Sequence, residues 1–337
     1  MANLTPGTQQ WHGQVVEEIL DPDRKIADPH HHLWRRPGGF DYLLADLWGD
    51  TDSGHNIVKT VFVECHSEYR TDGPENLRPI GETEFVAGVA EESTRGTEKQ
   101  ARIAGIVAHA DLALGDAVEE VLQAHEAAGQ QRFKGIRHAG ARAEDPSGMM
   151  IAGRAPESLY ENRRFREGMK VLGRMGLTYD TWHYHYQNPG FAALARAVPE
   201  TTMVLDHFGT PLGVGRYEGK REEIYTQWEK DIAEIAKCDN VVAKLGGMAM
   251  PDNGFGWHLR AAPPTSDEFV AVQKRYYLHT IECFGPDRCM FESNFPVDKY
   301  SISYQVLWNG LKKIAQDFSE DEKDAMFSGT ASRVYRL

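Results

Sequence analysis

Residues 101–138 read ARIAGIVAHADLALGDAVEEVLQAHEAAGQQRFKGIRH, and this stretch decides the fold class. It opens with a β-branched apolar segment at 101–112, continues with apolar residues at helical spacing in DAVEEVLQAHEAAG, and returns to a short apolar segment at 132–138. The order strand, helix, strand predicts two parallel strands joined by a helical crossover.

The same alternation extends in both directions from this unit. Short apolar segments recur at 25–32, 56–66, 176–185, 201–209, 240–247 and 288–296, with a helical stretch at 82–94. Eight such strands in 337 residues predict an α/β protein, a single (β/α)8 TIM barrel with a C-terminal helix. Residues 1–337 then form one domain, in which 1–24 are an N-terminal extension. Ser319 and Glu322 have the spacing of a capping box, which predicts the start of the terminal helix.

Four connections are longer than a barrel requires. They span 35–54, 66–81, 139–157 and 247–265, and each follows the C-terminal end of a predicted strand. In a barrel of this kind the loops at that face build the active site. We therefore expect these long βα-loops to shape a pocket.

Composition excludes several classes of protein. The 37 Lys and Arg residues against 50 Asp and Glu residues give a net charge of −13, which argues against nucleic-acid binding. No apolar run approaches the ~18 residues of a membrane span. The N-terminus has no basic and apolar leader, so a cytoplasmic location is expected. The four cysteines are scattered, which disfavours a disulfide framework or a cysteine-based zinc site.

Histidines collect at the ends of three predicted strands. They are His30 and His32 in the first strand, His183 and His185 in the fifth, and His207 in the sixth. Alternation along a strand puts the two members of each pair on one face, with His31 on the opposite face from its neighbours. Each histidine alone is more often a hydrogen-bonded structural residue, but independent histidines have no reason to gather at one rim. Their repeated placement predicts one site at the mouth of the barrel.

An ordered set of motifs resembles the amidohydrolase-related proteins, a branch of the amidohydrolase superfamily of (β/α)8 barrels. The motifs are D-x-H-x-H-x-W at 28–34, GIRH at 135–138, D-x-W at 180–182, LDHFG at 205–209, KLGG at 244–247 and ESNFPVD at 292–298. Within the branch the chain looks most like the lactonases, which include fuconolactonase and 2-pyrone-4,6-dicarboxylate lactonase. The decarboxylases are the nearer alternative.

The resemblance implies roles for several residues. His30, His32 and His185 match the positions of metal ligands, with His183 as the alternative to His185, and His207 matches the histidine of the sixth strand. Arg137 matches an arginine suited to a bidentate grip on a substrate carboxylate. Without the resemblance, it would equally fit a structural ion pair. The cofactor is then one divalent metal, zinc or manganese, or none, because the lactonases include metal-free members.

The chain departs from the family pattern at the eighth strand. Asn294 stands where the family has an aspartate that binds metal or activates water, and an amide cannot take a proton at neutral pH. Glu292, on the same strand face, is one replacement as base or ligand, although a structural salt bridge would also explain it. Asp298 or Glu64 would be another source of a carboxylate. A third possibility is that a histidine activates the water while Asn294 orients the substrate or an oxyanion.

These observations favour a hydrolase that opens a small cyclic ester by attack of an activated water. Tyr42 and Trp48 are expected to cover the ring, and His66, Tyr69 and His138 are further pocket candidates. One alternative is a metal-dependent, non-oxidative decarboxylase of an aromatic or muconate-type acid, and another is a non-catalytic binding barrel. The expected partner is a small carboxylated or hydroxylated molecule, with no nucleic acid and no membrane. Homodimerisation is expected from the general frequency of dimers among soluble enzymes.

Overall fold

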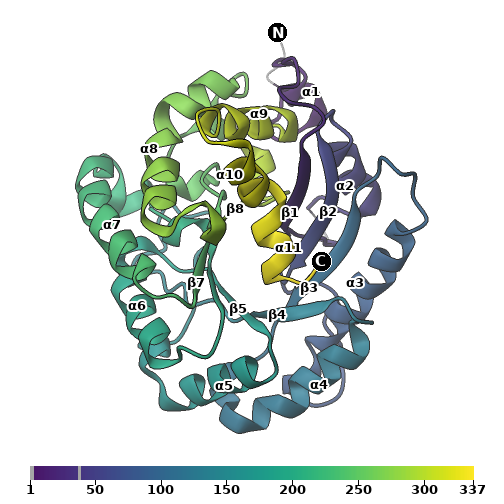
Figure 1. The fold of residues 1–337 in the computed structure, drawn as a ribbon, viewed down its shortest axis with the longest axis vertical. Helices are drawn as coiled ribbons and strands as arrows, with labels where there is room; N and C mark the ends of the chain where they lie inside the picture. Colours follow the sequence, from purple (N-terminus) through teal and green to yellow (C-terminus); the bar gives the residue numbers. More distant parts are fainter. Residues whose placement is uncertain (1–3, 37–38) are drawn as a thin grey trace.

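The computed structural model describes residues 4–36 and 39–337, and eight parallel strands form its centre (Figure 1). The strands pair in chain order, each with the next, as expected for a (β/α)8 barrel. They are β1 Lys25–His31, β2 Asn56–Val63, β3 Arg102–Ala108, β4 Phe133–Arg137, β5 Thr178–Thr181, β6 Met203–Leu205, β7 Val241–Leu245 and β8 Cys289–Phe291.

Helices between the strands form the outer ring. They are α2 Leu44–Thr51, α3 Ile80–Ser93, α4 Val118–Ala128, α5 Arg163–Arg174, α6 Asn188–Ala197, α7 Arg221–Ala236 and α8 Ser266–Phe284. After β8 the chain continues with α9 Tyr304–Ile314, α10 Glu320–Asp324 and α11 Thr330–Val334. The capping box of Ser319 and Glu322 at the start of α10 is confirmed.

The first and last strands meet, so the barrel is nearly closed. The Asn294 amide donates to the His30 carbonyl at 3.0 Å, and the His32 amide donates to the Phe295 carbonyl at 2.8 Å. Below them, the Tyr304 hydroxyl donates to Asp28 Oδ2 at 2.9 Å. These bonds hold the residues after β8 against β1, the two segments that carry Glu292 and His30.

The core has two layers. One lies between the strands and the ring of helices, and the other fills the inside of the barrel. In the inner layer, valines from four strands pack against Ala331, Val334 and Tyr335. Figure 1 accordingly shows α11 in the middle of the ring, where it covers one end of the barrel. A substrate must therefore enter from the opposite end, where the βα-loops lie.

The strands are shorter than the sequence predicts, and this changes the position of two histidines. The fifth strand was expected over 176–185 but ends at Thr181, because the chain turns into a short 3-10 helix at His185–Gln187. His183 and His185 therefore lie beyond the strand, and the alternation rule does not apply to them. The connection over 35–54 also differs from a loop, because it contains α2.

The N-terminal segment lies against the loops of the barrel mouth. In α1, Gln9–His12, the Trp11 indole donates to the Arg260 carbonyl at 3.1 Å and His12 Nε2 lies 2.9 Å from the Lys299 carbonyl. Arg260 follows β7 and Lys299 follows β8. The segment thus tethers two of the loops that surround the site.

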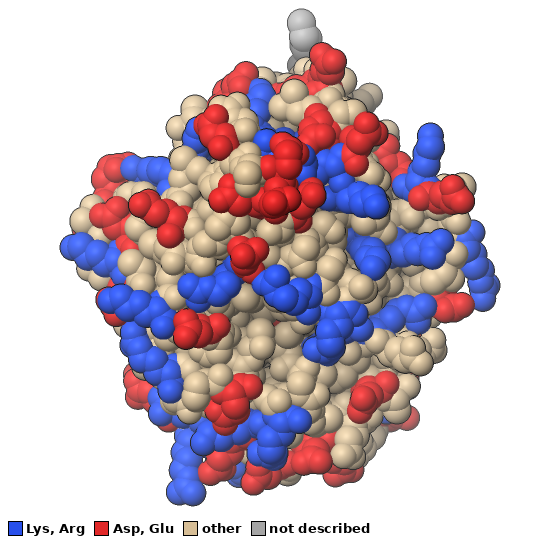
Figure 2. All heavy atoms as spheres, viewed as in Figure 1, with Lys and Arg blue, Asp and Glu red and all other residues tan. Residues whose placement is uncertain are grey.

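Charges of both signs are interspersed on the face that α11 covers (Figure 2). An acidic group lies over α10, which carries Glu320, Asp321, Glu322 and Asp324. Within residues 4–36 and 39–337, none of the helices combines the length and the apolar character that crossing a membrane requires.

Candidate active site

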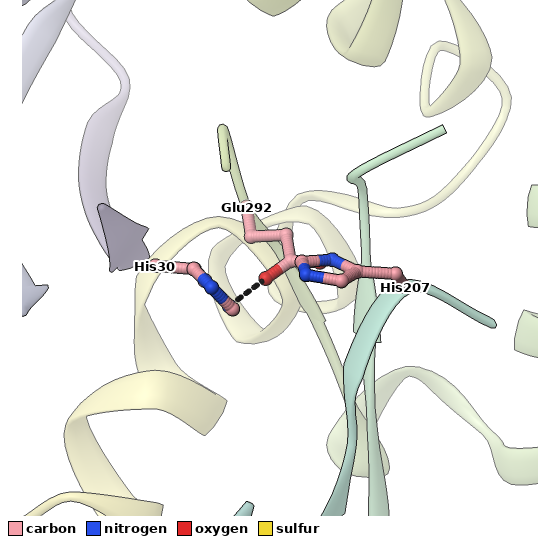
Figure 3. A group of neighbouring side chains, drawn as sticks. All are labelled: His30, His207 and Glu292. Atoms are coloured by element: carbon pink, nitrogen blue, oxygen red, sulfur yellow. Dashed lines mark hydrogen bonds and ion pairs between the residues drawn. The ribbon is translucent and has the colours of Figure 1, made fainter. Parts of the chain in front are cut away.

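Three buried side chains from three parts of the barrel meet at its mouth. His30 lies on β1, His207 follows β6 and Glu292 follows β8 (Figure 3). His207 Nδ1 lies 2.6 Å from Glu292 Oε1, and His30 Nδ1 lies 2.8 Å from Glu292 Oε2. Their potential ligand atoms all lie within 4.8 Å of one another. One carboxylate therefore contacts two imidazoles.

Glycines of the KLGG segment make room for this contact. A Cβ on Gly247 would lie 2.1 Å from His207 Nδ1, and one on Gly246 would lie 2.3 Å from the Glu292 carbonyl oxygen. His207 and Phe208 themselves have positive φ values of 54° and 58°. Left-handed conformations are unfavourable for residues other than glycine and collect at functional sites. The backbone is thus shaped to bring His207 against Glu292.

Two cationic side chains approach the ring of His30. Arg137 Nη1 lies 3.3 Å from Nε2, and Lys244 Nζ lies 3.3 Å from Nδ1. Burial, followed by the charge of Lys244, lowers the pKa of His30 well below its usual value, so this imidazole is neutral. Because an arginine only donates, Nε2 of His30 must accept the hydrogen bond from Arg137. The single proton of the neutral ring is therefore assigned to Nδ1, which faces Glu292.

Buried carboxyl groups outnumber buried cations around the site. Burial raises the pKa of Glu292 to about 8 and that of Asp206 to about 6, because both would be charged in a poorly hydrated environment. The carboxyl groups are Glu64, Asp180, Asp206 and Glu292, whereas the basic groups are Arg137 and Lys244. An additional positive charge would relieve this excess.

The donor set fits a divalent metal ion. Two imidazoles and a carboxylate are ligands that zinc prefers. Both carboxylate oxygens of Asp206 are buried and accept no hydrogen bond, although Lys244 Nζ lies 3.2 Å from Oδ1. His30, His207 and Glu292 are therefore the residues that would hold the ion.

A cavity of about 160 Å³ lies next to this group. Its polar lining residues are His32, Arg36, Glu64, Cys65, His66, Arg137, His207 and Asn294. Its apolar walls come from several βα-loops: Trp34, Ile151, Trp182, Met250 and Val297. The long loops thus shape a pocket as the sequence predicts.

Arg137 is held by Glu64. Its Nε donates to Glu64 Oε1 at 2.7 Å and its Nη2 donates to the Glu64 carbonyl oxygen. Burial alone would raise the pKa of Glu64, but the charge of Arg137, the neighbouring histidines and the hydrogen bond from Arg137 together outweigh burial and lower this pKa to about 2. With two nitrogens occupied, Arg137 does not present the free fork that a bidentate grip on a substrate carboxylate requires.

His32 and Asn294 line the pocket from opposite sides of the β1–β8 junction. His32 Nδ1 donates to the Val63 carbonyl at 2.8 Å, which leaves Nε2 as an acceptor. Asn294 Nδ2 donates to Asp298 Oδ1 at 2.9 Å, and Asp298 Oδ2 accepts from the Ala249 amide. Asp298 is fully buried and orients Asn294 from behind the pocket.

The structure does not bring His185 or His183 to the group. His185 Nδ1 accepts from the Leu212 amide at 3.3 Å, and His183 Nε2 lies 2.9 Å from Asn188 Oδ1. Among the described residues, neither belongs to a cluster of potential metal ligands, and His207 and Glu292 are grouped with His30 instead. The ligand set of His30, His32 and His185 that the resemblance implies stays a prediction, of which the described group of potential ligand atoms contains His30.

Three other pocket candidates lie elsewhere. Tyr42 is buried, and its hydroxyl donates to Asp50 at 2.7 Å. Trp48 lies on α2 and donates to the Ala101 carbonyl at the start of β3, at the end of the strand remote from the site. His138 Nδ1 accepts from the Leu112 amide at 3.2 Å. None of the three lines the described cavity, so the expectation that they contact the substrate is not reproduced.

The sequence reasoning missed the buried charges beneath the group. Lys244 Nζ donates to Asp180 Oδ2 at 2.7 Å and lies 3.2 Å from Asp206 Oδ1. Tyr335 also donates to Asp180. The sequence does carry a signal for these charges, because each of three apolar strand segments contains a charged residue. A charge at such a buried position needs a partner of opposite charge.

Comparison with known proteins fits this arrangement. A family model described as amidohydrolase matches residues 27–337. The protein y4mH of Sinorhizobium fredii, uncharacterized itself, is 31% identical over 344 residues, covering 94% of this chain and 99% of the relative. The chain belongs to the amidohydrolase family.

Other relatives of this amidohydrolase carry more informative names. It is 24% identical to the L-fucono-1,5-lactonase of Burkholderia multivorans, over 92% of this chain and 95% of that enzyme. The crystal structure of an amidohydrolase from the same species with bound zinc has a TM-score of 0.68 at 22% identity, covering 93% of this chain and 99% of that one. The structural likeness demonstrates the barrel fold. Family membership supports an enzyme.

Proposed function

We propose that this amidohydrolase opens a small cyclic ester by attack of an activated water. The observation that carries the proposal is the pair of His207 and Glu292, in which the histidine lines the pocket and the carboxylate lies behind it. A buried carboxylate that holds one nitrogen of a pocket histidine is a general arrangement for proton abstraction.

His207 is the group that takes the proton. When Glu292 is ionised, it accepts the Nδ1 proton of His207 and leaves Nε2 with a free lone pair. Glu292 is fully buried and does not line the cavity, so its effect on a water molecule passes through His207. In this mechanism His207 and Glu292 do the work of the aspartate that is missing from the eighth strand, and Asn294 does not need to carry a proton.

Other residues serve the reacting carbonyl. Asn294 Nδ2 has a second proton besides the one donated to Asp298, and Arg137 supplies a permanent positive charge at the pocket floor. Both favour the negative charge that develops on the carbonyl oxygen as water attacks. A divalent metal held by His30, His207 and Glu292 would instead supply Lewis-acid polarisation of the carbonyl when bound, because a His207 that ligates a metal is not free to act as the base. His32 Nε2, an acceptor, is suited to a hydroxyl group of the substrate.

The relative that acts on L-fucono-1,5-lactone and the size of the cavity support a lactone as substrate. A volume of about 160 Å³ suits a single small ring, and the apolar walls suit its carbon face.

Hydrolysis of a panel of five- and six-membered lactones, followed by proton release, tests the proposal. We expect kcat to fall by roughly 10²- to 10⁴-fold in both His207→Asn and Glu292→Gln, the range of general acid–base catalysis, with a smaller effect on KM. The double variant should lose little more than either single one, because the two residues act as a unit. His279→Gln, on the outer helix α8, is the matched control and should retain activity.

Two results would point elsewhere. Release of carbon dioxide from aromatic carboxylic acids, with no lactone opened, would replace hydrolysis by decarboxylation. If no compound is turned over and the variants bind a found ligand as the native protein does, the barrel is a binding protein.

A further inference from the structure

His66 differs from the other histidines of the pocket in its access to water. Its side chain is 66% exposed, whereas His32 and His207 are 4% and 3% exposed. It nevertheless lines the same cavity. A proton lost from its ring during a reaction is therefore readily replaced from solvent.

A buried carboxylate oxygen faces this ring. His66 Nε2 lies 3.5 Å from Glu64 Oε2, which is buried and has no hydrogen-bond partner, while Oε1 of the same carboxylate is bound to Arg137. A carboxylate oxygen at this distance can accept a hydrogen bond through a small movement of the ring and so orient the imidazole. Glu64 thus has one oxygen for Arg137 and one directed toward His66.

The backbone holds His66 in this position. The amides on either side of it, those of Cys65 and Ser67, donate to Glu82 Oε1 at 3.1 and 2.7 Å. His66 itself has a φ of 60°, an unfavourable conformation that persists only where the surroundings impose it. A buried glutamate therefore fixes the loop that presents the imidazole at the pocket edge.

Several titratable groups surround His66. From β2, β3, β4 and the loop they are Glu64, Cys65, Tyr69, His109, Arg137 and His138. The ring of His109 lies 5.4 Å from that of His66. Glu64 is the group whose free oxygen faces the imidazole.

We propose that His66 is a second catalytic residue, the general acid that protonates the leaving oxygen of the ester. This inference rests on the proposed lactone hydrolysis. Water forms a bond to the carbonyl carbon and gives its proton to His207, while the bond between that carbon and the ring oxygen breaks. His66 gives its proton to this oxygen, which becomes the hydroxyl of the product. Both histidines then exchange protons with solvent, and the net reaction converts lactone and water into a hydroxy acid.

The dependence on the leaving group tests this role. δ-Valerolactone releases an alkoxide, which needs a proton as it leaves, whereas dihydrocoumarin releases a phenolate, which is stable without one. For His66→Gln we expect kcat/KM to fall at least about tenfold on δ-valerolactone and less than about threefold on dihydrocoumarin. Added imidazole should restore part of the activity of His66→Ala on δ-valerolactone. The melting temperature of both variants should stay close to that of the native protein, because the side chain is exposed.

Equal losses on the two lactones would mean that His66 only binds or positions the substrate, and unchanged rates would mean that it has no part in the reaction. Either result overturns the general-acid role of His66. The proposed hydrolysis would still hold if His207→Asn loses activity as expected. If the native protein opens neither lactone nor any other of the panel, both proposals fall together.

Discussion

Glu292 contacts His30 and His207 with its two oxygens, and this single carboxylate links the first and sixth strands of the barrel. At the neighbouring position that faces the pocket, Asn294 brings an amide that is oriented by Asp298. The carboxyl groups of Glu292 and Asp298 thereby lie behind the imidazoles and the amide, away from the reacting carbonyl. Such a distribution suits attack on a neutral ester, because an oxyanion develops on the pocket side.

The close approach of His207 to Gly247 gives a test at the same scale. In Gly247→Ala the added methyl group would lie only 2.1 Å from the present position of His207 Nδ1. The backbone φ of +69° at this residue is also one that alanine disfavours. We expect displacement of His207 and at least a tenfold loss of kcat on the lactone. Gly88→Ala is the matched control, because its Cβ would meet nothing within 4 Å on exposed helix α3. Full activity in Gly247→Ala would contradict the role given to His207.

Between elements, a buried histidine joins two helices to a strand. His125 on α4 accepts from the Thr83 hydroxyl on α3 at 2.8 Å and donates to the His109 carbonyl after β3 at 2.9 Å. Both ring nitrogens are used in the neutral form. Burial accordingly lowers the pKa of His125 to about 4.

This pair of bonds predicts acid sensitivity. Because the folded pKa lies below the unfolded value of 6.5, the unfolded chain binds the extra proton first, and stability is lost as pH falls from 6.5 toward 4. From pH 7.5 to 5.0, His125 should account for a loss of roughly 2 kcal/mol in the free energy of unfolding. His125→Gln costs stability at neutral pH, but its deficit relative to the native protein should shrink over this range. Urea unfolding at the two pH values measures it, and a constant deficit would contradict the assignment.

The bounds of individual strands and helices are the part of the fold that the sequence predicts least well. The eight strands are visible as apolar segments, and His30 and His32 follow from the alternation of β1. The fifth strand was extended too far because TWHYH continues the β-branched and aromatic pattern, although the chain has already turned. The sequence places Trp48 in the long connection over 35–54, because the short helix α2 within it is as polar as a loop. Neither error could be avoided without the tertiary contacts that end each element.

For the whole molecule, the excess of buried carboxyl groups at the mouth predicts a response to zinc. A cation that binds only the folded state stabilises it by RT ln(1 + c/Kd), where c is the free cation concentration, so the melting temperature rises as this concentration exceeds the dissociation constant. We expect added zinc to stabilise the native protein, and to stabilise His207→Asn and Glu292→Gln much less. His185→Gln should respond as the native protein does, since His185 lies outside the group. An equal response in all four proteins would exclude His207 and Glu292 as ligands.

The architecture as a whole was predictable, whereas the charge network was not. Motif order along the chain indicated which strands carry histidines, but the sequence left open which carboxylate replaces the one missing at Asn294. The contact of Glu292 with two imidazoles depends on how β8 meets β1, which is a property of barrel closure. Lys244 and Asp206 were overlooked because nothing in a linear pattern says which buried charges neutralise one another.

The bond between Tyr304 and Asp28 joins positions 276 residues apart, and this separation bears on how the protein folds. Contacts so distant in sequence form slowly, because a long stretch of chain must be ordered before they are gained. The site combines residues of β1 with residues that follow β6 and β8. A partly folded chain can therefore contain helices and strands without an assembled site. During refolding, the circular dichroism signal of the helices should therefore recover before activity, which returns only when β8 and α11 dock onto β1.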